Sequence, residues 1–405
     1  MKNLKLWWNK NIALFVCGNF VSRIGNVIFD IVMTWWLISE TSSARYVGFV
    51  LGASTFAVAL ISPLSGALSD RYNKKYIMII TDFISGILSI LIGIMAFNNY
   101  INVYLLILIN FLMGSCASLF KPAVKSILPK IAKKEYMVQV NSISNNLAEL
   151  TKFIGPALAS VLVGISIIGI PGMFIFNGIT YIISAISEIF IDYFEDDSKD
   201  MKSEGVFKNI KEGFSYLSKQ KIIFKVIAVS SIVNIFIASY NILLPLFINN
   251  DLKLDGDFYS YILMAEAAGG IVITILFTFW SSIKPNLEKL FYALAFSGLA
   301  LSMISIFANR YLILVSVFLF GLFLSAFNTL FFSYVQIVVD EKYLGRVFST
   351  IFMIATFIMP VSYVVFGYIG DFVLKYIFLI SGLSIILVSL PILSLSKSMD
   401  LEIIN

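Results

Sequence analysis

The chain contains no histidine and little charge of either sign. None of its 405 residues is His, and Asp, Glu, Lys and Arg together make up 13% of the sequence. Histidine is the side chain that most readily changes charge near neutral pH, and it is the most common metal ligand. Its absence excludes Ser/His/Asp and Cys/His catalytic sites, so proton chemistry has to rely on carboxylates. We therefore expect no enzymatic activity, no bound metal and no cofactor.

Cysteines and phosphate-binding motifs are also scarce. The two cysteines, Cys17 and Cys116, lie in different apolar segments. We interpret them as small buried residues and expect no disulfide between them. The chain has no Gly-rich phosphate-binding loop of the Walker type. This excludes ATP hydrolysis by that route.

Long apolar segments dominate the sequence, in which hydrophobic residues make up 59%. About 20 apolar residues are enough to cross a hydrocarbon core of ~30 Å, and segments of this kind recur along the whole chain. We predict an all-α membrane protein with twelve spans and no soluble domain between them. The spans are expected at 11–38, 44–68, 76–97, 102–120, 138–167, 171–192, 222–249, 258–280, 287–308, 311–334, 346–372 and 375–395.

Positive charge is distributed unevenly between the two sides of the predicted membrane. With a cytoplasmic N-terminus, four of the 29 Lys and Arg residues lie outside and two lie within spans, which leaves 23 on the cytoplasmic side. Membrane proteins keep their basic residues on that side, so both termini are predicted to be cytoplasmic. The positive charge therefore reports topology, and we expect no nucleic-acid partner. The four outer residues are Arg45, Lys253, Arg310 and Lys375.

One polar segment separates the spans into two groups of six. We predict an N-terminal bundle at 1–192, a cytoplasmic linker at 193–221 and a C-terminal bundle at 222–405. Within the linker, the apolar residues of 205–217 recur at helical spacing, which is typical of an amphipathic helix lying on the membrane surface.

The stretch between the second and third spans has a recognisable pattern of glycine, acid and base. Gly66 is followed by Asp70 and Arg71, and then by Lys74 and Lys75. This arrangement resembles the signature loop of the major facilitator superfamily of transporters. The resemblance implies two six-helix bundles with one cavity between them, and transport by alternating access.

Three further segments are similar to the macrolide-efflux branch of this superfamily. They are 121–130 after the fourth span, 147–158 in the fifth, and 343–349 at the entry to the eleventh. Together with the Asp70 loop they follow the family order over nearly the full length. The resemblance is specific for the superfamily but is poor at naming a transported compound.

The Asp70 loop is expected to act as a gate. An acidic residue is favoured at the N-terminus of a helix by the helix dipole. The resemblance implies that Asp70 closes the cytoplasmic side by meeting the eleventh span, here near Arg346. Asn73 stands where the family usually has glycine, and Asn tolerates the left-handed conformation. The alternative is a basic loop that only fixes topology. A similar run, 367–371, lies on the predicted outer side, and we interpret it as a look-alike.

Polar residues within the first span form a single stripe. Asn19, Arg23, Asn26 and Asp30 are spaced by 4, 3 and 4 residues, so they share one helical face. Charged residues cost about 2.5–3.5 kcal/mol each at the centre of a span and usually face a cavity. We predict that this stripe contacts the transported compound, with Asp30 as a candidate for proton coupling. The alternative is a structural pair that holds the first helix against its neighbours.

Carboxylates in other spans are the remaining candidates for proton coupling. Glu149 shares a stripe of the fifth span with Asn145 and Lys152, which are candidate cavity residues. A self-neutralising pair of Glu149 with Lys152 is the alternative, because residues three apart are neighbours on a helix. Glu266 has no basic residue near it in sequence and is our first candidate for a proton carrier. Asp82, in the third span, is expected to brace the Asp70 loop.

From these features we predict a secondary transporter in the cell membrane. It would export amphipathic, drug-like compounds of the macrolide type in exchange for protons, and its partners would be the small molecule, protons and the lipid bilayer. We expect a monomer. Two alternatives stay open. One is a transporter of the same fold for a siderophore, peptide, lipid or metabolite, in either direction. The other is a membrane sensor or immunity protein without transport activity.

Overall fold

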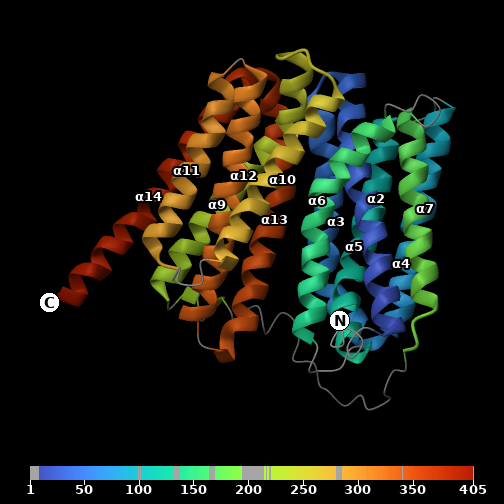
Figure 1. The fold of residues 1–405 in the computed structure, drawn as a ribbon, viewed down its shortest axis with the longest axis horizontal. Helices are drawn as coiled ribbons and strands as arrows, with labels where there is room; N and C mark the ends of the chain where they lie inside the picture. The colour runs from blue at the N-terminus through green and yellow to red at the C-terminus, as the bar shows by residue number, and fades with distance from the viewer. Residues whose placement is uncertain are drawn as a thin grey trace. The chain divides into compact units, whose positions relative to one another are not determined.

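The computed structural model is helical wherever the described residues form regular structure, and no strand occurs among them (Figure 1). The residues that it describes are 9–98, 100, 102–131, 137–163, 169–193, 214–215, 217–218, 220–279, 285–307, 309–339 and 341–404.

Each of the twelve predicted spans corresponds to one long helix, which confirms the predicted all-α membrane architecture. Eleven of these helices are long and apolar enough to cross a membrane, and α6 contributes a shorter apolar segment, Leu150–Leu162. In the first half the helices are α2 (Lys10–Thr41), α3 (Ala44–Arg71), α4 (Lys74–Phe97), α5 (Val103–Ile131), α6 (Met137–Val163) and α7 (Gly169–Ile189). In the second half they are α9 (Lys221–Asn250), α10 (Gly256–Phe279), α11 (Leu287–Ile306), α12 (Arg310–Val338), α13 (Glu341–Val373) and α14 (Ile377–Ile404). A 3-10 turn, η2 (Leu374–Tyr376), joins the last two.

The chain divides into two compact units. Unit 1 comprises Met1–Leu37 and Ala53–Val206, and unit 2 comprises Ile38–Gly52 and Phe207–Asn405. The turn between α2 and α3 and the first residues of α3 therefore belong to unit 2. The domain boundaries at 192 and 222 stay a prediction. The amphipathic linker helix at 205–217 lies outside the described residues, apart from Phe214, Ser215 and Leu217.

Asparagine begins five of the helices. In each case the side-chain oxygen accepts a hydrogen bond from a backbone N–H of the first turn, which satisfies one of the donors left free at a helix start. One of these residues corrects an expectation. Asn73 has φ −61° and ψ 119°, so it is an extended N-cap residue and not left-handed. The five are Asn9, Asn73, Asn102, Asn286 and Asn309.

Helices α4 and α7 cross closely because each presents a glycine at the contact. A Cβ atom on Gly178 would lie 2.7 Å from the carbonyl oxygen of Gly86, so neither position tolerates a larger side chain without a shift. Nearby, the Ser89 hydroxyl donates to the Phe174 carbonyl over 2.7 Å. Small residues and hydrogen bonds of this kind hold helices together in lipid, where water does not drive association. This contact fixes the two helices that carry Asp82 and Glu188.

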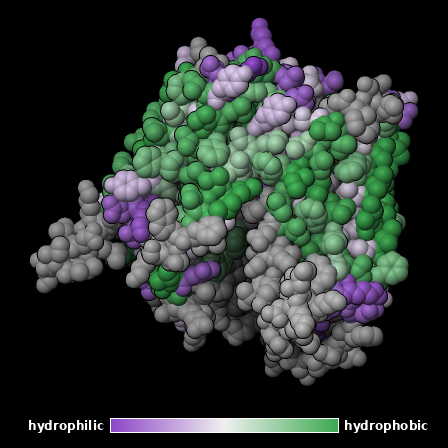
Figure 2. Space-filling view, in the orientation of Figure 1, coloured by the Kyte–Doolittle hydropathy of each residue, from purple (hydrophilic) through white to green (hydrophobic). Residues whose placement is uncertain are grey.

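Large apolar side chains cover the outward faces of the helices. Figure 2 shows hydrophobic residues over the long middle part of the described helices, with hydrophilic residues gathered toward their ends. Many of these side chains are strongly exposed, including Tyr104 at 82%, Val161 at 64% and Leu387 at 64%. Such a surface is incompatible with water and is expected where helices face lipid.

Candidate functional site: a cavity in unit 1

A cavity of about 670 Å³ lies within unit 1. Side chains from α2, α4, α5, α6 and α7 line it, and phenylalanines such as Phe15, Phe20 and Phe120 form part of its apolar wall. Its volume is typical of small-molecule sites, which combine apolar walls with a few polar groups. The polar residues that line it include Asn19, Arg23, Asn26, Asp82, Lys121 and Tyr181.

Three of the four residues in the predicted stripe of α2 line this cavity. They are Asn19, Arg23 and Asn26. Tyr181 of α7 lines the same cavity as Asn26. Within the described part of the chain, the Arg23 guanidinium forms no hydrogen bond and no ion pair. An unpaired cation at a cavity wall is available to a ligand, which a structural ion pair would not be.

Asp30, the fourth residue of the stripe, does not line the cavity. Its side chain remains accessible although protein atoms surround it on most sides. Its charge acts on Tyr181, which is also within reach of the charge on Asp82. Tyr181 is thus within reach of two carboxylates on different helices, a relation that helical spacing within α2 cannot reveal.

Of the three α6 candidates, only Lys152 has a described side chain. The backbone of Asn145 and Glu149 is helical, but their side chains lie outside the described part of the structure. Lys152 is exposed and does not line the cavity. The described residue of α6 that lines the cavity is Leu147. Whether Glu149 pairs with Lys152 stays a prediction.

Glu266 lies in unit 2 and has a partner that its own segment of sequence does not contain. The Tyr240 hydroxyl of α9 donates a hydrogen bond to Glu266 Oε2 over 2.8 Å. Tyr240 is only 1% exposed, and its ring contacts those of Phe320 and Phe378. The carboxylate is therefore held by a hydroxyl whose position is fixed by aromatic packing.

The predicted gating loop is mostly helical. α3 continues to Arg71, so Gly66 and Asp70 lie in its last turns, and the connection to α4 is a turn at Tyr72 and Asn73. An Asn cap directly after an uninterrupted helical segment leaves no room for the longer loop that the sequence suggested. The side chains of Asp70, Arg71 and Arg346, and the surroundings of Gly66, lie outside the described structure, so contact between Asp70 and Arg346 stays a prediction.

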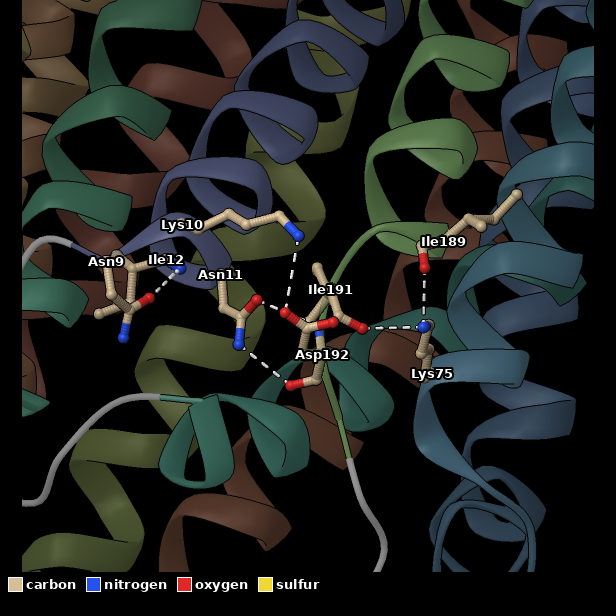
Figure 3. Close-up of polar contacts among 8 residues, drawn as sticks. All are labelled: Asn9, Lys10, Asn11, Ile12, Lys75, Ile189, Ile191 and Asp192. Carbon is tan, nitrogen blue, oxygen red and sulfur yellow. Dashed lines mark hydrogen bonds and ion pairs between the residues drawn. The ribbon is translucent and has the colours of Figure 1, made fainter.

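The two lysines of this region are described. Lys74 is buried, with 9% of its surface exposed. The Lys75 ammonium donates to the carbonyl oxygens of Ile189 and Ile191, both over 2.8 Å, at the end of α7 (Figure 3). A cation is favoured at the C-terminus of a helix, where carbonyl groups lack intrahelical partners. Lys75 thus ties the start of α4 to the end of α7.

The start of α2 holds the same end of α7 from another direction. Asn11 and Asp192 form a reciprocal pair, in which the Asn11 amide donates to the Asp192 carbonyl and the Asp192 N–H donates back, each over 3.0 Å (Figure 3). Lys10 lies 3.6 Å from the Asp192 carboxylate, but both side chains are about two-thirds exposed, so this ion pair contributes little. Three helix ends of unit 1 therefore meet in one polar cluster.

Asp371, which we interpreted from sequence as part of a look-alike motif, holds the start of α3 within unit 2. Its carboxylate accepts from the Ser43 hydroxyl over 2.7 Å and from the Ala44 backbone N–H over 3.1 Å. The next residue, Arg45, has its guanidinium 4.5 Å from the centre of the ring of Tyr368, which lies one turn before Asp371 on α13. This part of α13 has the role of anchoring the α2–α3 turn, which its sequence alone did not indicate.

Two further acidic residues belong to the surroundings of the cavity. Asp82 of α4 lines it, and Glu188 of α7 lies behind Asp82, within range of its charge. They are 3% and 1% exposed, respectively. We expected Asp82 to brace the Asp70 loop and did not single out Glu188. A carboxylate inside an apolar span is the sequence signal that could have found both.

The chain belongs to the Major Facilitator Superfamily, whose family model matches residues 15–361. It is 21% identical to Macrolide efflux protein A of Streptococcus pyogenes, over 98% of each chain. It is 24% identical to the Staphyloferrin A transporter of Staphylococcus aureus (strain NCTC 8325 / PS 47), over 96% of this chain and 97% of that protein. The crystal structure of a bacterial homologue of the iron transporter ferroportin has 16% identity and a TM-score of 0.73, covering 94% and 98% of the two chains. The predicted family and fold are confirmed.

Proposed function

We propose that this member of the Major Facilitator Superfamily exports amphipathic, drug-like compounds of the macrolide type in exchange for protons. The observation that carries the proposal is the cavity in unit 1, whose aromatic wall and polar α2 stripe suit a bulky compound with few polar groups. The similarity to Macrolide efflux protein A over 98% of the chain supports this choice of compound. We propose a monomer in the cell membrane with both termini in the cytoplasm, acting without a cofactor and without enzymatic chemistry.

Proton coupling is proposed to use carboxylates, because the chain has no histidine. Glu266 is the first candidate, since its partner Tyr240 is a hydroxyl that can donate to a carboxylate and also accept from a carboxylic acid. Glu149 and Asp30 are the other candidates. Inward proton movement supplies about 2.3 kcal/mol per charge at 100 mV and about 1.4 kcal/mol per pH unit. This is adequate to concentrate a compound more than tenfold.

The test uses purified protein in proteoliposomes with an acidic interior. A panel of macrolides and other lipophilic cations is added outside while the luminal pH is followed. We expect one class of compound to release protons from wild type and from the control Glu288→Gln, which changes an exposed carboxylate at the start of α11. The same compound should release none from Glu266→Gln. Absence of any response in wild type contradicts proton antiport of these compounds. A normal response in Glu266→Gln shows that another carboxylate carries the proton.

A second candidate function is export of an anionic solute of the siderophore class. The observation that favours it is Arg23, whose guanidinium lines the cavity without a hydrogen bond or ion pair to any described residue. Guanidinium groups bind carboxylates through two parallel hydrogen bonds, a geometry that lysine does not reproduce. A carboxylate-bearing siderophore should then compete with a bound lipophilic reporter in wild type and lose affinity in Arg23→Lys. Competition that is equal in both proteins contradicts this second function.

A further inference from the structure

Two buried carboxylates lie on the packed helices α4 and α7, and one of them, Asp82, is part of the cavity wall. Asp82 of α4 and Glu188 of α7 are 3% and 1% exposed. Asp82 Oδ2 and both carboxylate oxygens of Glu188 are buried and have no hydrogen-bond partner among the described atoms. Buried polar atoms without partners are rare in folded proteins, so the pair requires an explanation.

A serine hydroxyl lies beside the pair and is itself unsatisfied. Ser184 is one turn before Glu188 on α7, has no exposed surface, and its Oγ makes no hydrogen bond with any described group. It interacts with the Asp82 carboxylate but stays short of hydrogen-bond geometry. From the other side α2 closes the site, because Gly18 lies directly against Ser184 and Ser187. Buried oxygen atoms of Asp82, Ser184 and Glu188 thus remain without hydrogen-bond partners in the described structure, and of these three residues Asp82 lines the cavity.

Among the described residues, no cationic side chain forms an ion pair with Asp82 or Glu188. Arg23 of α2 and Lys121 of α5 line the cavity that Asp82 reaches, but neither forms an ion pair with Asp82 or Glu188 in the described structure. Lys75, from the start of α4, is bound to the carbonyl groups at the end of α7. The other ionisable groups that face Asp82 are Tyr181 of α7 and Cys116 of α5. Both are neutral in their ordinary state and cannot compensate an anion.

Two carboxylates in this setting cannot both stay ionised. Burial disfavours the charged form of each, and the charge of one disfavours the charge of the other. A metal ion is a poor alternative, because hard cations need six or more oxygen ligands and the described residues contain no cluster of three acidic or cysteine ligands. A proton needs only one oxygen, and the neighbouring hydroxyl of Ser184 can exchange hydrogen bonds with either form.

We propose that Asp82 and Glu188 form a proton-binding pair, in which Asp82 exchanges protons with the cavity and Glu188 holds a proton behind it. The inference rests on the proposed proton-coupled transport and adds a site in unit 1 to the candidates named above. Loss of the proton from Asp82 places a negative charge at the cavity wall, which attracts a cationic compound. Return of the proton removes that charge and favours release.

The test measures protonation directly and needs no transported compound. A hydrophobic carbodiimide reacts with protonated carboxylic acids in apolar surroundings, and mass spectrometry of the full-length purified protein identifies the modified residue. We expect labelling of Glu188 near neutral pH that falls as the pH rises. Exposed Glu288 should stay unlabelled in the same sample.

Asp82→Asn provides the decisive comparison, because it keeps the side-chain shape and removes the neighbouring charge. The midpoint of Glu188 labelling should then move to lower pH by about one unit, since Glu188 ionises more easily without a charged neighbour. Glu188→Gln should lose the label at this peptide while keeping the elution volume and melting temperature of wild type. Labelling of Glu188 that is absent, or that Asp82→Asn leaves unchanged, overturns the proposal.

Protection by sodium or a divalent cation at constant pH also overturns the proposal, because it identifies a cation site in place of a proton site. The result of the labelling experiment can be distinguished from the result of the transport assay. Normal labelling without compound-dependent proton release leaves the pair standing and contradicts the proposed function, and the reverse pattern contradicts the pair alone.

Discussion

Replacing Asp371 with alanine should release the α2–α3 turn from α13. The Asp371 carboxylate accepts one hydrogen bond from the Ser43 hydroxyl and one from the Ala44 backbone N–H, at the start of α3. Both sides of this contact belong to unit 2, so its release would let the start of α3 move away from α13 in a local opening. The Asp371 contact favours the state in which they remain together.

The size of the effect follows from these two hydrogen bonds. Loss of an N-cap acceptor costs about 1 kcal/mol, and loss of a second exposed hydrogen bond about 1 kcal/mol more. A total of about 2 kcal/mol corresponds to a change of about thirtyfold in the ratio of the two states. Asp371→Asn keeps an acceptor oxygen but loses the charge, so its effect should lie between wild type and Asp371→Ala.

A cysteine at position 52 can report the separation. Gly52 is buried, and a Cβ atom there would lie 3.5 Å from the Val364 side chain of α13, so a small side chain fits. The reporter Gly52→Cys is made after Cys17 and Cys116 have been replaced by serine, and whole cells are treated with a maleimide that does not cross membranes. Adding Asp371→Ala should raise the labelling rate by about thirtyfold if exchange between the states is fast.

The matched control is Asp255→Ala. Asp255 Oδ1 accepts from the Phe258 N–H over 3.4 Å at the start of α10, so its loss removes a cap within one segment and leaves the α2–α3 turn untouched. Its labelling rate should equal that of the Gly52→Cys parent. Equal rates for Asp371→Ala and Asp255→Ala would refute the assignment of Asp371 as an anchor.

Two further changes test packing and proton handling in unit 2. Gly382→Ala would overlap the carbonyl oxygen of Gly298, where α14 crosses α11, so we expect a loss of about 1–3 kcal/mol in the free energy of unfolding. Gly52→Ala, with room for a Cβ atom, should stay within about 0.5 kcal/mol in the same denaturation experiment. Tyr240→Phe keeps the aromatic packing but removes a hydrogen-bond donor to Glu266. The pH profile of coupled transport should then differ from that of wild type, and an unchanged profile would contradict a role for Glu266 in coupling.

The helices could be predicted from sequence because lipid imposes a strict demand on each of them. A spanning segment needs about 20 apolar residues and has to satisfy its backbone internally, so length and hydropathy are sufficient to locate it. The stripe of Asn19, Arg23 and Asn26 could be predicted for a similar reason, since the 3.6-residue period fixes which residues share a helical face. Its position at the cavity wall of unit 1 follows from that face. Whether these residues contact a transported compound stays a prediction.

Contacts between segments that are distant in the sequence could not be predicted in this way. Asp371 contacts residues 327 and 328 positions earlier in the chain, and the partner of Glu266 lies 26 positions away on another helix. No local period encodes such distances. The sequence therefore suggested that Glu266 was isolated and that the motif at Asp371 was a coincidence, because in both cases the partner is a small polar group on another element.

A common principle emerges from these three acidic sites. Tyr240 donates to Glu266, Ser43 donates to Asp371, and Ser184 lies beside Asp82, so each carboxylate has a hydroxyl as a neighbour. A cationic partner would hold a carboxylate in its ionised form, whereas a hydroxyl can donate to the anion or accept from the acid. In a chain without histidine, such neighbours allow an acidic residue to gain and lose a proton while its surroundings keep the same packing. The Asp82 and Glu266 sites should therefore be able to change protonation, which carbodiimide labelling of Glu188 and the Tyr240→Phe pH profile can each contradict.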